Sequence, residues 1–199
     1  MRYGLVGSEM CIRDRPMTSS SFIPYGRQDI RQDDIDAVVS VLCSEFLTQG
    51  PKVPAFEAAV AAHTGAAHAI AVNSATSALH IACMALGVGS GDVVWTVPTT
   101  FVASANCALY CGASVDFVDI DPTRYTMCPK ALQTKLQTTS QLPKVIIPVH
   151  LCGQSADMKA IYAIARNYGI SVIEDASHAI GATYDCLLYT SDAADDKQC

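Results

Sequence analysis

Two stretches near the start of the patterned region have apolar residues at helical spacing. In the first, the acidic pair Asp33-Asp34 precedes apolar residues that recur three or four positions apart, namely Ile35, Val38, Val39, Leu42 and Phe46. This spacing predicts an amphipathic helix with acidic residues in its first turn. A second helix is predicted from Pro51, which suits a first helical turn, to Gly65, which suits a helix stop.

From residue 68 onward, short apolar runs alternate with helical patterns. Strands are predicted at 68–72, 92–97, 115–120, 144–149 and 171–174, and the first of them is expected to be buried. Helices are predicted at 75–86, 101–110, 131–136 and 158–168. Strands that alternate with helices of about ten to fifteen residues are typical of a mainly parallel sheet covered on both faces. The pattern therefore predicts an α/β fold, without internal repeats or a low-complexity linker.

Composition narrows the possible functions. Half of the 199 residues are hydrophobic, which allows a sizeable core in one domain or in part of a larger one. The net charge of −6 and the scattered basic residues argue against nucleic acid or a membrane surface as a partner. The nine cysteines stand singly, without a CxxC pair, so we expect reduced thiols packed as small apolar residues. These features predict a cytoplasmic protein with no metal site and no membrane span.

Both ends of the chain lack the periodic pattern of its middle. The first residues, MRYGLVGSEMCIRDR, and the last, CLLYTSDAADDKQC, resemble translated sequencing-adaptor sequence. On this interpretation residues 1–16 are a non-native leader, residues 17–184 are the native part and residues 185–199 are a non-native tail. The alternative is an ordinary disordered arm and tail.

An acidic pair at the end of the last predicted strand is the strongest chemical signal in the chain. Glu174 and Asp175 end an apolar run, and His178 follows Asp175 three residues later. In an α/β fold, ligands bind beyond the carboxyl ends of the parallel strands, so Asp175 is placed to face a heterocyclic cofactor. An ionised aspartate there would keep a pyridine nitrogen protonated. The alternative is that Glu174 and Asp175 only cap a helix start.

Three further positions follow predicted strands. The turn Asn73-Ser74-Ala75-Thr76-Ser77 opens a helix, whose first N–H groups and dipole favour a phosphate, although the same residues suit an ordinary helix cap. Phe101 follows the next strand, where it can stack on a flat cofactor or pack into the core. His150 is expected to be a hydrogen-bonded structural histidine rather than a catalytic one.

Several longer segments match one known family in the same order along the chain. They are LTQGPKVPAFE, NSATSALH, GDVVWTVPTTFVASANCALYCGA, VDFVDID, PVHLCGQSADM and VIEDASHAIGA. This series covers almost all of residues 22–184 and resembles the DegT/StrS family of pyridoxal-phosphate-dependent sugar aminotransferases. The resemblance implies the aspartate-aminotransferase-like fold, also called PLP fold type I, with an incomplete large domain. Within this family, the most similar branch is the one that aminates a 4-keto UDP-sugar in pseudaminic acid biosynthesis. The segments that carry this resemblance are IPYGRQDI, NSATSALHIAC and TTFVASANCALYCGA.

The resemblance also assigns roles to matching positions. It implies that the cofactor phosphate is held by Ser74, Ala75 and Thr76. It further implies that Phe101 stacks on the pyridine ring, that Asp175 pairs with the ring nitrogen, and that His178 lies beside the phenolic oxygen. Family members take an amino group from an amino acid, usually glutamate, and pass it to a keto-sugar, and a second subunit completes the active site. The expected partners are therefore a nucleotide sugar, an amino-acid donor and, for the full-length protein, a second copy of itself.

Transamination also needs a lysine that forms a Schiff base with the cofactor and moves a proton. In the family this lysine follows the Asp-x-x-His motif within an aromatic and serine-containing loop. The lysines of this chain are Lys52, Lys130, Lys135, Lys144, Lys159 and Lys197. The first five fall on predicted surface helices or strand starts, and Lys197 lacks the loop pattern. We therefore expect an inactive fragment that holds half of the cofactor site.

Other functions stay open at this point. The same fold could serve a transaminase for a different nucleotide sugar, or a non-catalytic binding or regulatory protein. A nicotinamide-dependent oxidoreductase would need a glycine-rich GxGxxG turn after the first strand, and NSATS does not supply one.

Overall fold

A computed structural model describes residues 28–184 and 187–188, and the chain divides into two compact units, 1–50 and 51–199. The described part of the first unit contains helix α2 (Gln32–Leu42). The Asp34 carboxylate accepts a 2.9 Å hydrogen bond from the Arg31 backbone N–H, which stabilises the start of this helix. The predicted helix is confirmed, except that Phe46 lies beyond its end. Expectations for residues 1–27, 185–186 and 189–199 lie outside the described residues.

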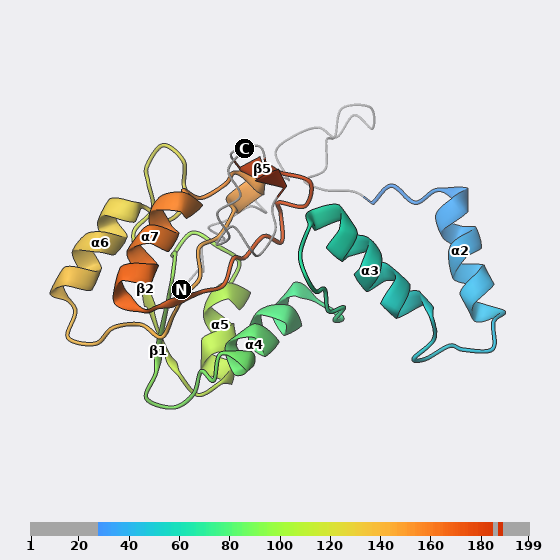
Figure 1. Ribbon diagram of the computed structural model, residues 1–199, viewed down its shortest axis with the longest axis horizontal. Coiled ribbons are helices and arrows are strands. Elements are labelled where there is room, and N and C mark those ends of the chain that lie inside the picture. The colour runs from blue at the N-terminus through green and yellow to red at the C-terminus, as the bar shows by residue number, and fades with distance from the viewer. Residues whose placement is uncertain (1–27, 185–186, 189–199) are drawn as a thin grey trace, which may run out of the picture. The chain divides into compact units, whose positions relative to one another are not determined.

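The second unit is built on a parallel sheet, as predicted (Figure 1). Its strands are β1 (Val93–Thr96), β2 (Ser114–Phe117), β3 (Val145–Ile146) and β4 (Ser171–Val172). They lie in the order β2-β1-β3-β4, and each neighbouring pair is parallel. The strands are shorter than the apolar runs that predicted them. A separate antiparallel pair is formed by β5 (Thr183–Tyr184) and β6 (Leu187–Leu188).

The helices of the second unit begin and end close to their predicted positions. They are α3 (Lys52–Thr64), α4 (Ala75–Ala85), α5 (Ala103–Tyr110), α6 (Pro129–Thr138) and α7 (Met158–Tyr168), with a short 3-10 turn, η1 (Leu151–Gly153). Gly65 ends α3 in the left-handed conformation, with φ of 77°, which only glycine adopts without steric cost. No helix within the described residues is long and apolar enough to cross a membrane.

Alternate residues of the central strands feed two hydrophobic clusters. Val94 and Val145 pack in one cluster with residues of α4 and α5, whereas Trp95 and Ile146 pack in the other with residues of α6 and α7. Because successive side chains of a strand point to opposite faces, the two clusters mark the two faces of the sheet. Figure 1 shows α6 and α7 on one side of the strands and α4 and α5 on the other. Both faces are therefore covered, as the sequence predicts.

The predicted buried strand at 68–72 is wrong. These residues pair with no strand, and the Ile70 side chain is 78% exposed. One backbone contact is made to α3, since the Ala71 N–H donates to a Glu57 carboxylate oxygen at 2.8 Å. A strand needs a neighbouring strand for its backbone groups, and among the described residues the segment has no such neighbour. The apolar pattern alone could not show this, because strand pairing is not local.

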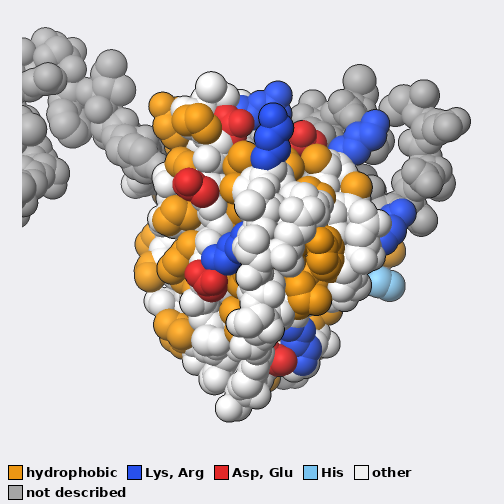
Figure 2. Space-filling view, turned by 90° about the vertical axis from the view of Figure 1, so that its left-hand side faces the viewer, with side chains coloured by type: hydrophobic (Ala, Val, Ile, Leu, Met, Phe, Trp, Pro, Cys, Tyr) orange, Lys and Arg blue, Asp and Glu red, His pale blue; other side chains and the backbone are white. Residues whose placement is uncertain are grey.

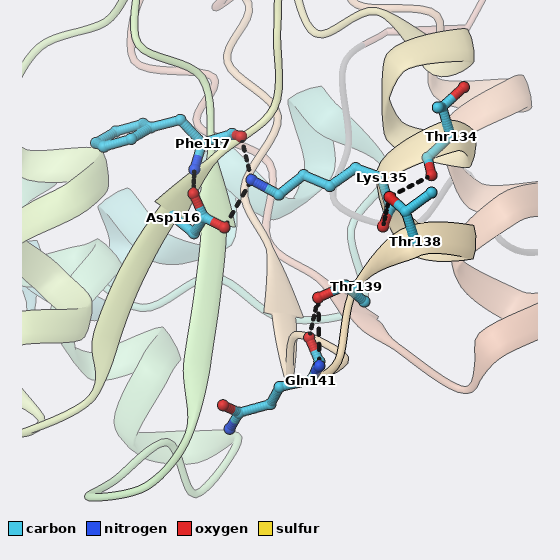
Figure 3. Close-up of polar contacts among 7 residues, drawn as sticks. All are labelled: Asp116, Phe117, Thr134, Lys135, Thr138, Thr139 and Gln141. Atoms are coloured by element: carbon cyan, nitrogen blue, oxygen red, sulfur yellow. Dashed lines mark hydrogen bonds and ion pairs between the residues drawn. The ribbon is translucent and has the colours of Figure 1, made fainter.

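The Lys135 side chain connects α6 to the edge strand β2 (Figure 3). Its ammonium group lies 2.6 Å from an Asp116 carboxylate oxygen and donates to the Phe117 carbonyl oxygen at 2.5 Å. The same group lies 4.8 Å from the centre of the Trp95 ring, within the range of a cation–π contact. The hydrogen bond from Lys135 lowers the pKa of the Asp116 carboxyl below its ordinary value.

On the face drawn in Figure 2, basic, acidic and hydrophobic side chains lie interspersed. The cysteines agree in part with the compositional prediction. Cys83 and Cys107 are fully buried between α4 and α5, as small apolar residues would be. The pKa of the Cys83 thiol is raised far above its usual range, chiefly by its hydrogen bond with Cys107 and secondly by burial. Cys43 and Cys152 differ from the prediction because they are exposed.

Candidate cofactor site

The carboxyl ends of the parallel strands meet the start of α4 around one open cavity of about 140 Å³. The chain passes from β1 to β2 on one side and later places β3 on the other side of β1. Ligands of open α/β sheets bind beside such a reversal of strand order. Among the residues that line the cavity are five of the six predicted site residues, namely Ala75, Thr76, Phe101, Asp175 and His178. The sixth, Ser74, precedes Ala75 at the start of the same helix.

Asp175 is held on both of its carboxylate oxygens. The Ser104 hydroxyl donates to Oδ2 at 2.6 Å, and the Ser177 hydroxyl donates to Oδ1 at 2.6 Å. The Ser177 backbone N–H also donates to Oδ1, at 3.3 Å. The backbone of Asp175 continues the sheet, since its N–H donates to the Pro148 carbonyl and its carbonyl accepts from the His150 N–H. The residue is only 7% exposed, yet it lines the cavity.

The neighbouring carboxylate, Glu174, has a separate set of partners. It lies 2.8 Å from Nε2 of His150 and accepts a hydrogen bond from the Tyr162 hydroxyl at 2.7 Å. On the other side of the imidazole, Nδ1 accepts a hydrogen bond from the Ala156 N–H at 3.2 Å. Because Nδ1 is an acceptor, the imidazole is assigned as the tautomer whose Nε2–H donates to Glu174. His150 therefore has the contacts of a buried, hydrogen-bonded histidine, although part of it also lines the cavity.

The start of α4 combines a helix cap with unused donors. Ser74 is the N-cap, and its hydroxyl oxygen accepts from the Ser77 N–H at 3.2 Å. The Ser77 hydroxyl in turn donates to the Asn73 side-chain oxygen at 2.7 Å. Within residues 28–184, the backbone N–H groups of Ala75 and Thr76 and the Thr76 hydroxyl have no acceptor. The helix start is thus capped, as the alternative of an ordinary helix cap predicts, and it still has donors for an anion.

Two of the predicted cofactor contacts lie on exposed side chains. Phe101 is 70% exposed and lines the cavity just before α5, so it is not part of the core. His178 is also exposed at the cavity. The carbonyl oxygen of His178 lies so close to Gly153 that a Cβ added there would be 3.2 Å away. Gly153 has φ of 82°, so both the backbone conformation and the close approach require glycine in this turn.

Two residues that contact Asp175 were missed in the sequence. Ser104 is fully buried in the first turn of α5, and its hydroxyl also lies 2.9 Å from that of Thr100. Ser177 follows Asp175 by two residues, a spacing at which short polar side chains commonly meet. Ser104 lies 71 positions from Asp175, so only the fold brings them together. The sequence signal that could have indicated Ser104 is its place in the first turn of the helix that follows β1, close to Phe101.

Lysines and metal ligands are absent from the described part of this site. None of the lysines between 28 and 184 lines the cavity, and Lys135 and Lys144 make ion pairs elsewhere. Lys197 lies outside the described residues. The described residues also contain no group of three side chains that could hold a metal ion.

Comparison with known proteins points to one family. The sequence profile of the DegT/DnrJ/EryC1/StrS aminotransferase family matches residues 28–186. The spore coat polysaccharide biosynthesis protein SpsC of Bacillus subtilis (strain 168) is 44% identical over 163 residues, which cover 82% of this chain and 41% of SpsC.

Solved structures support the same relationship. Helicobacter pylori PseC, an aminotransferase involved in the biosynthesis of pseudoaminic acid, is 30% identical, with a TM-score of 0.77 over 83% of this chain and 44% of PseC. The PLP form of the putative sugar aminotransferase Spr1654 from Streptococcus pneumoniae is 29% identical, with a TM-score of 0.77 over 83% of this chain and 45% of that protein. The chain therefore spans less than half the length of these relatives.

Proposed function

Because this chain belongs to the DegT/DnrJ/EryC1/StrS aminotransferase family, we propose that it supplies one part of the cofactor site of a pyridoxal-phosphate-dependent sugar aminotransferase. The proposed reaction moves an amino group from an amino acid, glutamate, to a 4-keto nucleotide sugar for a cell-surface glycan. We propose that none of the lysines of this chain, Lys197 included, forms the Schiff base, so that the chain alone is inactive. The full-length protein is proposed to be a cytoplasmic homodimer.

One observation carries this proposal: an aspartate carboxylate and the unused donors of a helix start face the same cavity. Pyridoxal phosphate has a basic ring nitrogen at one end and a dianionic phosphate on a side arm. Asp175 is an acceptor for the protonated nitrogen, and the start of α4 offers Ala75 and Thr76 as donors to the phosphate. The residues present therefore fit this group.

When bound, pyridoxal phosphate supplies an electron sink for the carbon that gains or loses the amino group. Asp175 would hold the proton on the ring nitrogen, which the charge of its carboxylate favours. Phe101 would cover one face of the ring with an aromatic surface and exclude water from it. His178, exposed at the cavity, would contact the ring's phenolic oxygen.

The substrate class rests on the relatives. SpsC is named for spore coat polysaccharide biosynthesis, and PseC for an aminotransferase of pseudoaminic acid biosynthesis. The first name supports a role in polysaccharide biosynthesis, and the second supports transfer of an amino group in pseudoaminic acid biosynthesis. The substrate proposed here is the 4-keto UDP-sugar of that biosynthesis.

The experiment begins by recovering the intact reading frame and purifying the full-length protein. We expect pyridoxal phosphate to produce the absorbance band of a lysine-bound cofactor, and 15N-glutamate to label the amino group of the sugar product. A cofactor band without transfer to any 4-keto nucleotide sugar would indicate a binding or regulatory protein. Absence of both would contradict the proposal.

A further inference from the structure

The carboxylate of Asp175 has nearly all of its acceptor positions filled by protein donors. An ionised carboxylate accepts about four hydrogen bonds, two on each oxygen. On Oδ1 both positions are taken, by the Ser177 hydroxyl and the Ser177 N–H. On Oδ2 one position is taken, by the Ser104 hydroxyl. Among the described residues a single position therefore remains, and it lies on Oδ2.

The Ser104 hydroxyl is itself fixed. It carries one proton, and its shortest contact is with Asp175 Oδ2 at 2.6 Å, compared with 3.2 Å to the Phe101 carbonyl. Since that proton goes to Asp175, the Thr100 hydroxyl must be the donor in its 2.9 Å contact with Ser104. Ser104 is completely buried, so water does not compete for these bonds. A chain of donors thus runs from Thr100 through Ser104 to Asp175.

We propose that Ser104 is a positioning residue, which fixes the plane of the Asp175 carboxylate so that its one remaining acceptor position meets a single ring N–H. The inference rests on the proposed function, because the ring N–H belongs to the cofactor. Without Ser104, the carboxylate would be held on Oδ1 alone and could rotate about its Cβ–Cγ bond. Its charge would remain, but its direction toward the cavity would be lost.

Two ligands that differ only at the ring nitrogen separate this role from a general role in folding. Pyridoxamine 5'-phosphate binds without a lysine, and its 1-deaza analogue has a carbon in place of the ring nitrogen. The ratio of their dissociation constants, measured by calorimetry on the full-length protein, reports the contact with Asp175. In the wild-type protein we expect pyridoxamine phosphate to bind more tightly than the analogue.

In Ser104→Ala we expect this ratio to fall about five- to tenfold while the affinity for the deaza analogue stays within about twofold, since the change acts through one hydrogen bond to a charged group. Ser104→Thr retains the hydroxyl and should restore the ratio. Thr100→Val, which removes the donor behind Ser104, should lower it by less. Ser114→Ala is the matched control, because that hydroxyl donates only to the Asp92 carbonyl, and it should leave the ratio unchanged.

Each outcome has a distinct meaning. An unchanged ratio in Ser104→Ala, or an equal loss of affinity for both ligands, would overturn the positioning role. If Ser104→Ala does not fold, Thr100→Val provides the same comparison, and an unchanged ratio there would count against the proposal. A wild-type protein that binds neither ligand, or binds both equally, would instead refute the proposed cofactor site.

Discussion

The Glu174 carboxylate lies 2.8 Å from Nε2 of His150. Glu174 is not among the residues that line the cavity, whereas its neighbour Asp175 is. Two consecutive acidic residues thus have different partners at the end of β4. Glu174 is hydrogen-bonded to His150 and to Tyr162 of α7, so it links the segments that follow β3 and β4 to α7. Its side chain is 6% exposed, and its contacts are consequently those of a buried structural group.

Replacing Glu174 with alanine should therefore affect stability first. We expect Glu174→Ala to lower the free energy of unfolding by about 2–5 kcal/mol, because it removes the hydrogen bonds that Glu174 makes with the imidazole and the phenol in a buried site. Glu174→Gln should cost less, since its amide oxygen can still accept from His150. Urea denaturation of the full-length protein measures both, with the exposed Glu45→Ala as the control. Equal stability of Glu174→Ala and the control would contradict this assignment.

Asp175→Asn should instead affect chemistry. The amide retains an acceptor for one of the two serine hydroxyls, so we expect a similar melting temperature. Amino transfer should fall by several orders of magnitude, because the ring nitrogen loses the charge that keeps it protonated. Steady-state kinetics of the full-length variant test this, alongside its thermal melt. Near-normal turnover would remove Asp175 from the proposed site.

Thr76→Val should weaken retention of the cofactor. The Thr76 hydroxyl lines the cavity and has no acceptor among the described residues, so a phosphate is its expected partner. Losing one hydrogen bond to a charged group should cost about 1.5–3 kcal/mol of binding free energy. A titration with pyridoxal phosphate measures this, and Thr138→Val on the exposed face of α6 is the matched control. The same affinity in both variants would leave the turn with its capping role alone.

The ion pair between Asp116 and Lys135 should make stability depend on pH in acid. The folded-state pKa of Asp116 is lowered by Lys135, so the unfolded chain binds more protons as pH falls below the ordinary value near 3.8. The stabilisation is therefore present above that value and is lost below it. Both side chains are partly exposed, so we expect Asp116→Asn to cost at most about 1 kcal/mol near neutral pH.

Urea midpoints at about pH 7 and about pH 2 test this pH dependence, since the wild-type advantage should be smaller at the lower pH. Asp119→Asn, at an exposed position nearby, is the control substitution. A wild-type advantage that is undiminished in acid would show that Asp116 acts through packing and not through its charge.

Residues 17–184 expressed alone should give insoluble or molten material without amino transfer. The side chains of segment 68–72 are mainly apolar, the segment has no strand partner among the described residues, and Ile70 is 78% exposed. Such segments promote aggregation. Solubility, the cooperativity of a thermal melt and absorbance with pyridoxal phosphate are the measurements. A soluble fragment with a cooperative melt would contradict the stability part, and measurable transfer would contradict the expectation that the chain is inactive.

The sequence was most informative where a structure is determined by local spacing. The helix from Pro51 to Gly65 and the helix at 158–168 were predicted almost to the residue, because apolar period and helix stops act within a few positions. The positions of Phe101 and Asp175 at the carboxyl edge of the sheet were predicted because each residue comes after the end of a predicted strand. The contact between Ser104 and Asp175 could not be predicted, since 71 positions separate them and no local pattern records it. The missing pairing of 68–72 has the same cause, because strand pairing is not local.

The strand order β2-β1-β3-β4 also sets a sequence of events for folding. β1 ends at Thr96, and β2 can pair with it soon afterwards, but β3 begins only at Val145. During synthesis, one edge of β1 therefore stays open while about fifty residues are added, and distant parallel pairing is slow. β4, which leads into Asp175, joins after β3. A ligand that needs Asp175 can thus stabilise this sheet only after β4 has docked, and cannot guide the earlier steps.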